Sequence, residues 1–448
     1  MRFGEFGQKA KRFLELAIAP LRSFNRRSTT PRLLRPSPFQ GRNRRLRRKR
    51  LQLRGTGLDA LARRLICLPP ERRCDVQFAG VGGEVVSSLR EGCLYCQSPP
   101  LSGVLFSDIS LPVVNATNAK EVCMRRVDLS EVSFVGSGLM RPECVYATKS
   151  GMIYASHADP KGQGGVTCIY PDGRIEVVVA NKGDVPETFM TNGYALLPDG
   201  DFMIANLGPD GGVFRLSRDG TLKLELDAVD GRKLPATNFV NRDAQGRLWV
   251  SVSTWHDPRD QAFRRGVCDG FVILMDANGS RIVADDVDFA NENKVHPSGE
   301  WLYVNETMGR AVVRYAIRSN GDLGPKEIAH EYGEGNYPDG FEFDSEGGIW
   351  MTSIVSNRVV HVAADGTETV VLEAGDPDLI ARAEAAFQQD AFSRDYQNAG
   401  HAAPLGNCAS ICFGGADLKS VYIGSLAGES VSTFRVDIAG AEPPHWQF

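Results

Sequence analysis

The chain has 448 residues, of which 42% are hydrophobic and 47 are glycine, and its formal net charge is −4. The length exceeds that of an average domain, although all-β propellers of this size form one unit. The apolar runs are too short for a transmembrane helix, so we expect no membrane partner.

Charge divides the chain into two unlike parts. Residues 1–73 carry 21 Lys and Arg against 4 Asp and Glu, whereas residues 124–448 carry 28 against 46. Strand-like alternation begins just after Met124. We therefore predict a basic, low-order extension over residues 1–123 and one folded domain over 124–448, and we expect Met124 to be the natural initiator.

The basic run RNRRLRRKRLQLR at residues 42–54 has no hydrophobic periodicity. Its composition is typical of a disordered or polyanion-binding arm. Contact with nucleic acid or an acidic membrane, and an organelle transit peptide, are the alternatives. Aromatic interleaving and a folded motif are both missing from the run, which disfavours nucleic-acid binding, and only this basic arm would provide it.

The ten cysteines do not form a metal-binding pattern. Cys93 and Cys96 make one CLYC pair without a second close pair or a histidine cluster, so we predict no zinc site there. The cysteines after Met124 are scattered, and we interpret them as buried free thiols of a cytoplasmic protein.

A repeat dominates the rest of the chain. Six segments share a polar residue, a short apolar run, a glycine turn and a second β-rich run: PECVYATKSGMIYAS, TNGYALLPDGDFMIAN, TNFVNRDAQGRLWVS, ANENKVHPSGEWLYVN, PDGFEFDSEGGIWMT and NCASICFGGADLKSVYIGS. Their turn glycines recur about every fifty residues. This period predicts an all-β, six-bladed β-propeller.

One segment differs from this pattern. Residues 376–396, DPDLIARAEAAFQQDAFSRDY, are rich in Ala, Glu and Gln, with apolar residues at helical spacing. They predict a helical insertion before the last blade, either a surface excursion or a lid over the mouth of the propeller.

The register of the repeat predicts a polar ring. Eight residues before each of the first five turn glycines stand Glu143, Asn192, Asn238, Asn291 and Asp339. Equivalent positions on the innermost strands of a propeller surround its axis, so these side chains should converge. In the sixth unit, Asn407 and Ser410 both fit, and Ser410 is preferred.

Two carboxylates with neutral amides suit a divalent cation that prefers oxygen ligands, such as calcium, magnesium or manganese. Zinc more often recruits His or Cys. A solvated polar channel, or a purely structural calcium ion, are the alternatives.

These motifs resemble the regucalcin and gluconolactonase family of six-bladed propellers over about residues 127–436. The likeness is most specific in RPECV around Glu143, in FAN and HPSGEWLYVNET around Asn291, in YPDGFEFDSEGGIW around Asp339, and in the last unit. The resemblance implies a sugar-lactone hydrolase that uses one divalent metal, with calcium favoured and zinc, magnesium or manganese as alternatives.

The resemblance also implies roles for single residues. Glu143, Asn291 and Asp339 would hold the metal, and Asp339 would also be the catalytic acid/base. Asn238 would orient the substrate, with Asn192 and Ser410 as further substrate contacts. The chain departs from the family at Glu292-Asn293 and Phe239-Val240, which leaves the particular lactone open.

Two other functions remain open on this scaffold: hydrolysis of aryl esters or phosphoesters, and non-catalytic binding of calcium, a ligand or a protein. His157 and His256 lie outside the ring register and are interpreted as incidental. Trp249, Trp301 and Trp350 follow the turns and are expected to pack between blades.

Overall fold

The computed structural model describes residues 77–81, 84–88 and 124–448, and the chain divides into two units, Met1–Asn115 and Ala116–Phe448. In the first unit, β1 (Gln77–Val81) pairs antiparallel with β2 (Glu84–Ser88). The predicted low-order extension included no such hairpin. The basic run at 42–54 and the CLYC pair lie outside the described residues.

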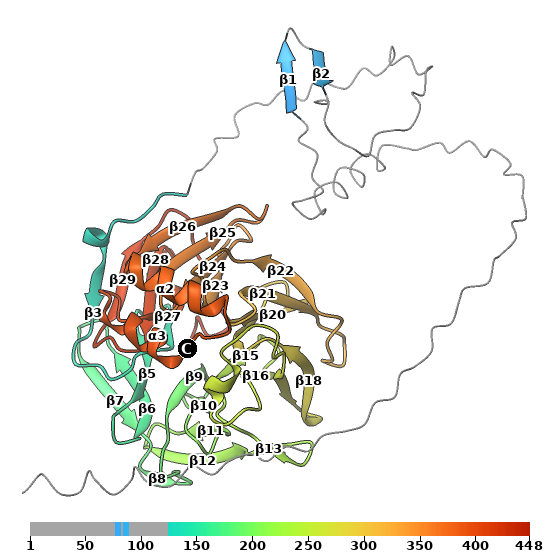
Figure 1. Cartoon of the computed structure of the whole chain (residues 1–448). Coiled ribbons are helices and arrows are strands. Elements are labelled where there is room, and N and C mark those ends of the chain that lie inside the picture. Colours follow the sequence, from blue (N-terminus) through green and yellow to red (C-terminus); the bar gives the residue numbers. More distant parts are fainter. Residues whose placement is uncertain (1–76, 82–83, 89–123) are drawn as a thin grey trace, which may run out of the picture. The chain divides into compact units, whose positions relative to one another are not determined.

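The second unit is a six-bladed β-propeller, as the repeat predicted (Figure 1). Each blade is an antiparallel sheet. From the innermost strand outward, the first three blades are β4 (Val145–Ala147), β5 (Ile153–Ala158), β6 (Gly164–Ile169) and β7 (Ile175–Val179); β9 (Thr191–Leu196), β10 (Phe202–Asn206), β11 (Val213–Leu216) and β12 (Thr221–Leu226); and β15 (Phe239–Arg242), β16 (Leu248–Val252), β17 (Gly270–Asp276) and β18 (Gly279–Val287). The next two are β19 (Ala290–Val295), β20 (Trp301–Glu306), β21 (Ala311–Ala316) and β22 (Glu327–Glu331); and β23 (Pro338–Phe343), β24 (Ile349–Ser353), β25 (Arg358–Val362) and β26 (Glu368–Glu373).

The sixth blade closes the propeller. It consists of β27 (Cys408–Gly414), β28 (Ser420–Ser425) and β29 (Val431–Arg435), and its outermost strand is β3 (Ser133–Val135), from the start of the domain. From β9 onward each innermost strand contacts the next, β27 contacts β4, and Tyr146 of β4 packs against Tyr194 of β9. The last blade combines strands from the start and the end of the domain, which closes the ring of blades.

The remaining elements of the propeller domain are short. They are η2 (Leu129–Glu131), η3 (Arg259–Ala262), the parallel strand β8 (Lys182–Gly183) beside β12, and the hairpin β13 (Ala228–Val229) and β14 (Arg232–Lys233).

Burial explains why the inner strands read as continuous apolar runs. All six residues of β9 and of β23 are buried, whereas the outer strand β7 is largely exposed. An inner strand packs against neighbouring blades on both faces, so it lacks the alternation of a half-exposed strand. The six repeat glycines all have positive φ, between 75° and 94°, as tight turns require: Gly151, Gly200, Gly246, Gly299, Gly347 and Gly415.

Two aspartates at strand ends accept hydrogen bonds from tryptophans that pack in the blades. Trp249 and Trp350 are fully buried, and their Nε1 atoms donate to Asp243 and Asp344 at 2.9 and 3.0 Å. The packing role predicted for these two tryptophans is confirmed. Trp301 is partly buried, against the cluster around Phe341 and Phe343.

The helical insertion lies where the sequence placed it, but it is not one helix. The structure has α2 (Pro377–Phe387), α3 (Arg394–Ala399) and η4 (Gly400–Ala402). The break contains Asp390 at φ +54° and the buried side chain of Phe392. A left-handed residue cannot continue an α-helix, which explains the interruption.

The thiols after Met124 are free, as predicted, but not all are buried. Cys144, Cys168, Cys408 and Cys412 are buried, and Cys268 is exposed on the connection before β17. None of the helices in the described ranges combines the length and hydropathy that a bilayer-spanning segment requires.

Candidate active site at the propeller mouth

Five predicted ring residues line one cavity of about 180 Å³, where the innermost strands begin: Glu143, Asn192, Asn238, Asn291 and Asp339. Each side chain is at least 95% buried. They come from five different blades. The repeat register therefore identified side chains that lie together in the fold although up to about two hundred residues separate them in the sequence.

A β-bulge near the start of an innermost strand directs the ring side chain toward the propeller axis in at least two blades. The pairing of the innermost strand with the next strand shifts register between Ala290 and Asn293 in β19, and between Pro338 and Phe341 in β23. Asn291 and Asp339 are the second residues of these bulged segments. A bulge bends the strand and redirects a side chain that would otherwise alternate regularly.

The sixth blade breaks the polar ring. In β27 the shift falls between Cys408 and Ile411, so the position equivalent to Asp339 is Ala409. Ser410 does not line the cavity, and its Oγ accepts a hydrogen bond from the backbone N–H of Val145 at 2.8 Å. Asn407 bonds Val355 and Gln397. The expectation that all six positions are polar was wrong, because the glycine offset differs in this unit.

Neighbouring side chains orient two ring amides with their oxygens toward the cavity. Asn238 donates its Nδ2 to Ser253 Oγ at 3.2 Å, and Asn291 donates its Nδ2 to Thr307 Oγ1 at 3.0 Å. The Oδ1 atoms of both amides and Oε2 of Glu143 are buried, and none has a hydrogen-bond partner among the residues that the structure describes. Such oxygens carry a desolvation cost that a ligand would offset.

Asn192 differs from the other amides. Its Oδ1 accepts from Arg141 Nη2 at 2.7 Å, and its Nδ2 donates to the backbone oxygen of Asn238 at 2.9 Å. Both ends of the amide are therefore occupied, and the geometry shows Asn192 positioning Arg141.

The two ring carboxyls have perturbed acidities. Burial, followed by the nearby Glu143, raises the pKa of Asp339 well above its ordinary value. Burial also raises the pKa of Glu143, against the opposing effect of Arg141 and Arg259. Neighbouring acids in a low-dielectric site resist ionising together unless a positive charge joins them.

The donor set fits a divalent cation that prefers oxygen ligands. The cavity offers two carboxylates and two unpaired amide oxygens, which suit calcium, magnesium or manganese. Over the described ranges, no group of three His, Cys, Asp or Glu side chains is placed to hold a metal. Amide oxygens would therefore have to complete the coordination.

The acidic residue beside the ring is charge-paired. Glu292 lies buried next to Asn291, and Lys294 Nζ approaches its Oε2 at 3.6 Å and Glu342 Oε2 at 2.8 Å. Burial is the main cause that raises the pKa of Glu292 well above its ordinary value. The departure from the family pattern thus adds a buried carboxyl that shares Lys294 with Glu342.

The sequence analysis missed three arginines that also line the cavity. Arg141 precedes β4, Arg259 begins η3, and Arg394 begins α3. Arg141 lies two residues before Glu143, so the sequence could have indicated that it is near the ring. The other two lie in a connection and in the insertion, outside the repeat register.

The insertion covers the mouth, which favours the lid interpretation over the surface excursion. Phe392, Arg394, Gln397, Asn398 and His401 line the cavity together with the ring residues, and α2 and α3 overlie the inner strands in Figure 1. His157 and His256, expected to be incidental, do not line it.

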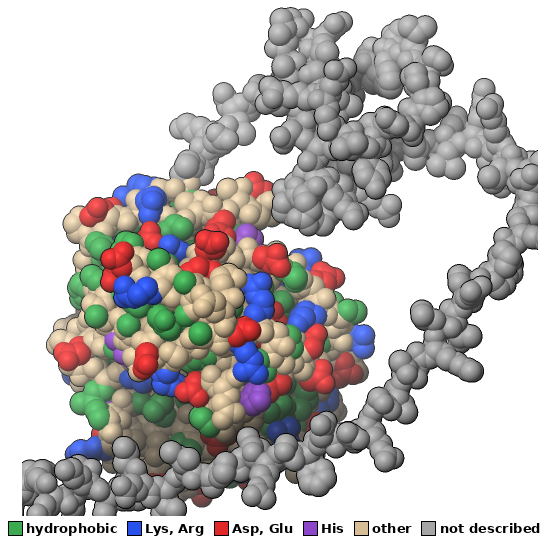
Figure 2. All heavy atoms as spheres, viewed as in Figure 1, with side chains coloured by type: hydrophobic (Ala, Val, Ile, Leu, Met, Phe, Trp, Pro, Cys, Tyr) green, Lys and Arg blue, Asp and Glu red, His purple; other side chains and the backbone are tan. Residues whose placement is uncertain are grey.

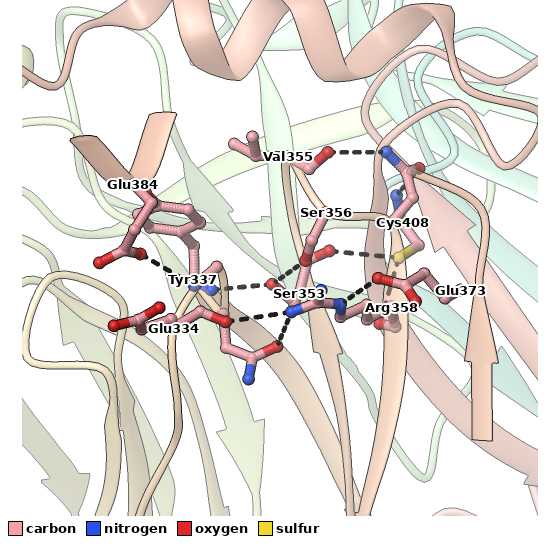
Figure 3. A network of polar contacts seen from close by, with 12 residues as sticks. Glu334, Tyr337, Ser353, Val355, Ser356, Arg358, Glu373, Glu384 and Cys408 are labelled. Atoms are coloured by element: carbon pink, nitrogen blue, oxygen red, sulfur yellow. Dashed lines mark hydrogen bonds and ion pairs between the residues drawn. The ribbon is translucent and has the colours of Figure 1, made fainter. Parts of the chain in front are cut away.

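Polar contacts anchor the insertion to the fourth blade and to the connection that leads into the fifth; Glu384 of α2 and nearby residues of the fifth blade are drawn in Figure 3. Glu384 of α2 accepts from Arg310 at 2.6 Å and from the backbone N–H of Gly335 at 2.9 Å. Below it, Ser353 Oγ accepts from the backbone of Tyr337 at 2.8 Å and from Ser356 at 2.7 Å. The lid is therefore fixed to the connection that leads into β23, the strand that carries Asp339.

A second cavity, of about 350 Å³, lies where the inner strands end. Lys294, Glu342 and C-terminal residues, including His445, line it. Its buried charges are paired with each other, as described for Lys294, whereas the mouth holds unpaired oxygens. The mouth is therefore the better candidate for an active site.

Comparison with known proteins agrees with this fold. The chain is 26% identical over 238 residues to a 6-deoxy-6-sulfogluconolactonase from Pseudomonas putida, covering 52% of this chain and 67% of that protein. It is 25% identical over 265 residues to a pentonolactonase from Haloferax volcanii, covering 52% and 78%. The crystal structure of a calcium-binding regucalcin from Agrobacterium tumefaciens superposes with a TM-score of 0.50 at 16% identity, covering 70% and 98%.

The sequence model of the SMP-30/Gluconolactonase/LRE-like region matches residues 89–380. The match begins within the stretch assigned to the extension, so the boundary at Met124 stays a prediction. It covers more than half of the chain, and the resemblance read from the motifs is confirmed: this chain belongs to the SMP-30/gluconolactonase family of six-bladed propellers.

Proposed function

We propose that this protein hydrolyses a sugar lactone at the propeller mouth, using one divalent cation held by Glu143, Asn291 and Asp339. One observation carries the proposal: buried, unpaired oxygens of Glu143, Asn238 and Asn291 converge with Asp339 on one cavity. The curated relatives support the reaction class, because both named above are sugar lactonases.

The cation would supply electrophilic chemistry, polarising the lactone carbonyl and lowering the pKa of a bound water. Calcium is the favoured ion because every donor is an oxygen, and magnesium, manganese and zinc are the alternatives to test.

Asp339 is the acid/base in this proposal. Its carboxylate takes a proton from the attacking water as the new carbon–oxygen bond forms at the carbonyl. It then returns that proton to the ring oxygen as the ester bond breaks, giving an open hydroxy acid.

Asn238 orients the substrate by accepting a hydrogen bond. Because Ser253 holds its Nδ2, the amide presents Oδ1, which accepts from a sugar hydroxyl and cannot donate to an oxyanion. Asn192 acts through Arg141. We assign Ser410 no substrate contact, since it lies outside the cavity.

Residues 124–448 are proposed to contain the whole catalytic domain, because β3 completes the sixth blade. N-terminal sequencing of the native protein tests this boundary. A start at Met124 would support it, and peptides from upstream would contradict the predicted initiator.

A panel of sugar lactones, aryl esters and phosphoesters, each assayed with calcium, magnesium, manganese or zinc, tests the function. We expect metal-dependent turnover of lactones that chelation abolishes. Turnover of esters or phosphoesters alone would move the reaction to another substrate class. Protein without bound metal and without turnover of any lactone would leave a non-catalytic binding protein.

A further inference from the structure

We infer that the mouth selects a lactone carrying a second, anionic group, a carboxylate, phosphate or sulfonate, bound by Arg141, Arg259 and Arg394. The inference rests on the proposed function and specifies its substrate class. Three cationic side chains from three separate segments line a cavity of about 180 Å³. A neutral sugar lactone would require no such concentration of charge.

The guanidinium groups nearest the ring are bound only to neutral atoms. Arg141 donates to the backbone oxygen of Thr191 and to Asn192. Arg259 donates to Ser253 Oγ at 3.0 Å, and its buried Nε finds no partner among the described residues. Neither arginine has a carboxylate within 4.0 Å in that part of the chain. A buried N–H of a charged group without an acceptor is costly and points to a ligand.

Two other shielded arginines of the domain are neutralised by carboxylates. Arg310 pairs with Glu384 at 2.6 Å, and Arg358 pairs with Glu373 at 2.6 Å. Arg394, on the lid, reaches only Asp260 at 3.5 Å and remains 45% exposed. Arg141 and Arg259 therefore differ from Arg310 and Arg358 in having no carboxylate partner among the described residues.

The arginines also lie close enough to repel one another. Burial, followed by Arg394, lowers the pKa of Arg259 to about 10, so the group stays charged at neutral pH. Like charges held together in a shielded cavity favour an anion that bridges them.

The charges that line the cavity would not balance once the cation is bound. The carboxylates that line the cavity are Glu143 and Asp339, and both are assigned to the divalent cation. Once the cation neutralises them, Arg141 and Arg259 remain without a counter-charge, and Arg394 keeps only its 3.5 Å pair with Asp260. On the lid-bearing face, basic and acidic side chains are interspersed (Figure 2), so the excess of arginine belongs to the cavity.

The positions of the arginines suggest where the anion binds. Ser253 Oγ is shared by Arg259 and by Asn238, so Arg259 lies beside the proposed sugar-binding amide. Arg394 faces the same cavity from the lid. The anionic group would lie between the ring and α3, away from the carbonyl that reacts beside Asp339.

The test compares D-glucono-1,5-lactone with 6-phospho-D-glucono-1,5-lactone, which share a ring and differ in one phosphate. D-glucaro-1,4-lactone tests a carboxylate in the same way. With the full-length, metal-loaded enzyme we expect kcat/KM to favour an anionic lactone by about tenfold or more, as a charge-assisted contact provides. Arg394→Gln should reduce this preference by about tenfold, and Arg394→Lys should restore most of it.

Arg174→Gln is the matched control. Arg174 pairs with Glu176 on the outer strands of the first blade, where its side chain is 55% exposed, and the substrate preference should survive its loss. If the wild-type enzyme hydrolyses the neutral lactone equally well or better, and Arg394→Gln slows both substrates alike, the anion inference is wrong while lactone hydrolysis stands.

A binding measurement separates the two proposals if no lactone is turned over. D-sorbitol 6-phosphate and D-sorbitol have no lactone bond, so calorimetry with the metal-loaded protein reads the anion site alone. Tighter binding of the phosphate, weakened by Arg394→Gln and by high salt, would support the site even without activity. Equal binding of both compounds would overturn it.

Discussion

Two sets of buried polar side chains in the same propeller differ in how their hydrogen-bonding groups are used. Asp344, at the end of β23, accepts from the backbone of Glu346 and Gly348, from Trp350 Nε1 and from His361 Nε2. At the other end of that strand, the ring presents oxygens of Asn291 and Glu143 that accept nothing from the described residues. Polar groups whose hydrogen bonds are all made within the protein hold the blades together, whereas polar groups without partners are available to a ligand.

The substitution Asp339→Asn is expected to have the largest effect. If ring polarity serves chemistry, lactone turnover should fall about a thousandfold, the usual contribution of an acid/base group. The unfolding temperature should stay the same or rise, because burial already disfavours the charged form of Asp339. Steady-state kinetics and calorimetry would measure the two effects. Full turnover in a variant that keeps its metal would remove Asp339 from the mechanism.

Asp344→Asn should show the opposite pattern. The substitution adds a donor where four donors already point, so we expect a loss of about 3 kcal/mol in the free energy of unfolding. Metal affinity should not change. Denaturant unfolding provides the measurement, and a variant of wild-type stability with weakened metal binding would reverse the roles given to the two ends of β23.

Asp344 also predicts a pH dependence. Although burial acts to raise it, hydrogen bonds from His361, Gly348 and Trp350 hold the pKa of Asp344 below its ordinary 3.8. The stabilisation that the Asp344 carboxylate provides is therefore complete at pH values above its pKa in the unfolded chain. It is lost as the pH falls below about 4 toward the pKa in the folded protein. Comparing wild-type and Asp344→Asn unfolding between pH 7 and pH 3 should show their difference shrinking. A difference that grows on acidification would contradict this sign.

A smaller effect is expected where the lid is anchored. Burial is outweighed by hydrogen bonds from Arg310 and Gln388, which lower the pKa of Glu384 to about 2. Glu384→Gln should cost about 1–2 kcal/mol and raise KM more than it lowers kcat, because the loosened insertion carries cavity residues. Glu327→Gln is the control, since its pair with Arg314 is about half exposed. An unchanged KM would show that the anchor does not serve the site.

The blade count and five ring positions could be predicted because propeller repeats keep a local register. The turn glycines sit at positive φ in all six blades, so counting from them located Asn291 and Asp339 correctly. Counting failed in the last blade, where a different strand-to-turn length places Ala409 at the ring position. Cavity arginines such as Arg259 and Arg394 lie outside the repeat, and their approach to the mouth depends on tertiary packing that no local pattern encodes.

Calorimetric titration of metal-free, full-length protein with calcium, magnesium, manganese and zinc tests whether the propeller mouth binds a metal. We expect one divalent ion per chain in the wild-type protein, affinity reduced at least about tenfold by Asn291→Leu, and no change with Asp344→Asn. Equal affinity in the wild-type and Asn291→Leu proteins, or no binding of any of the four ions, would contradict a metal site at the propeller mouth.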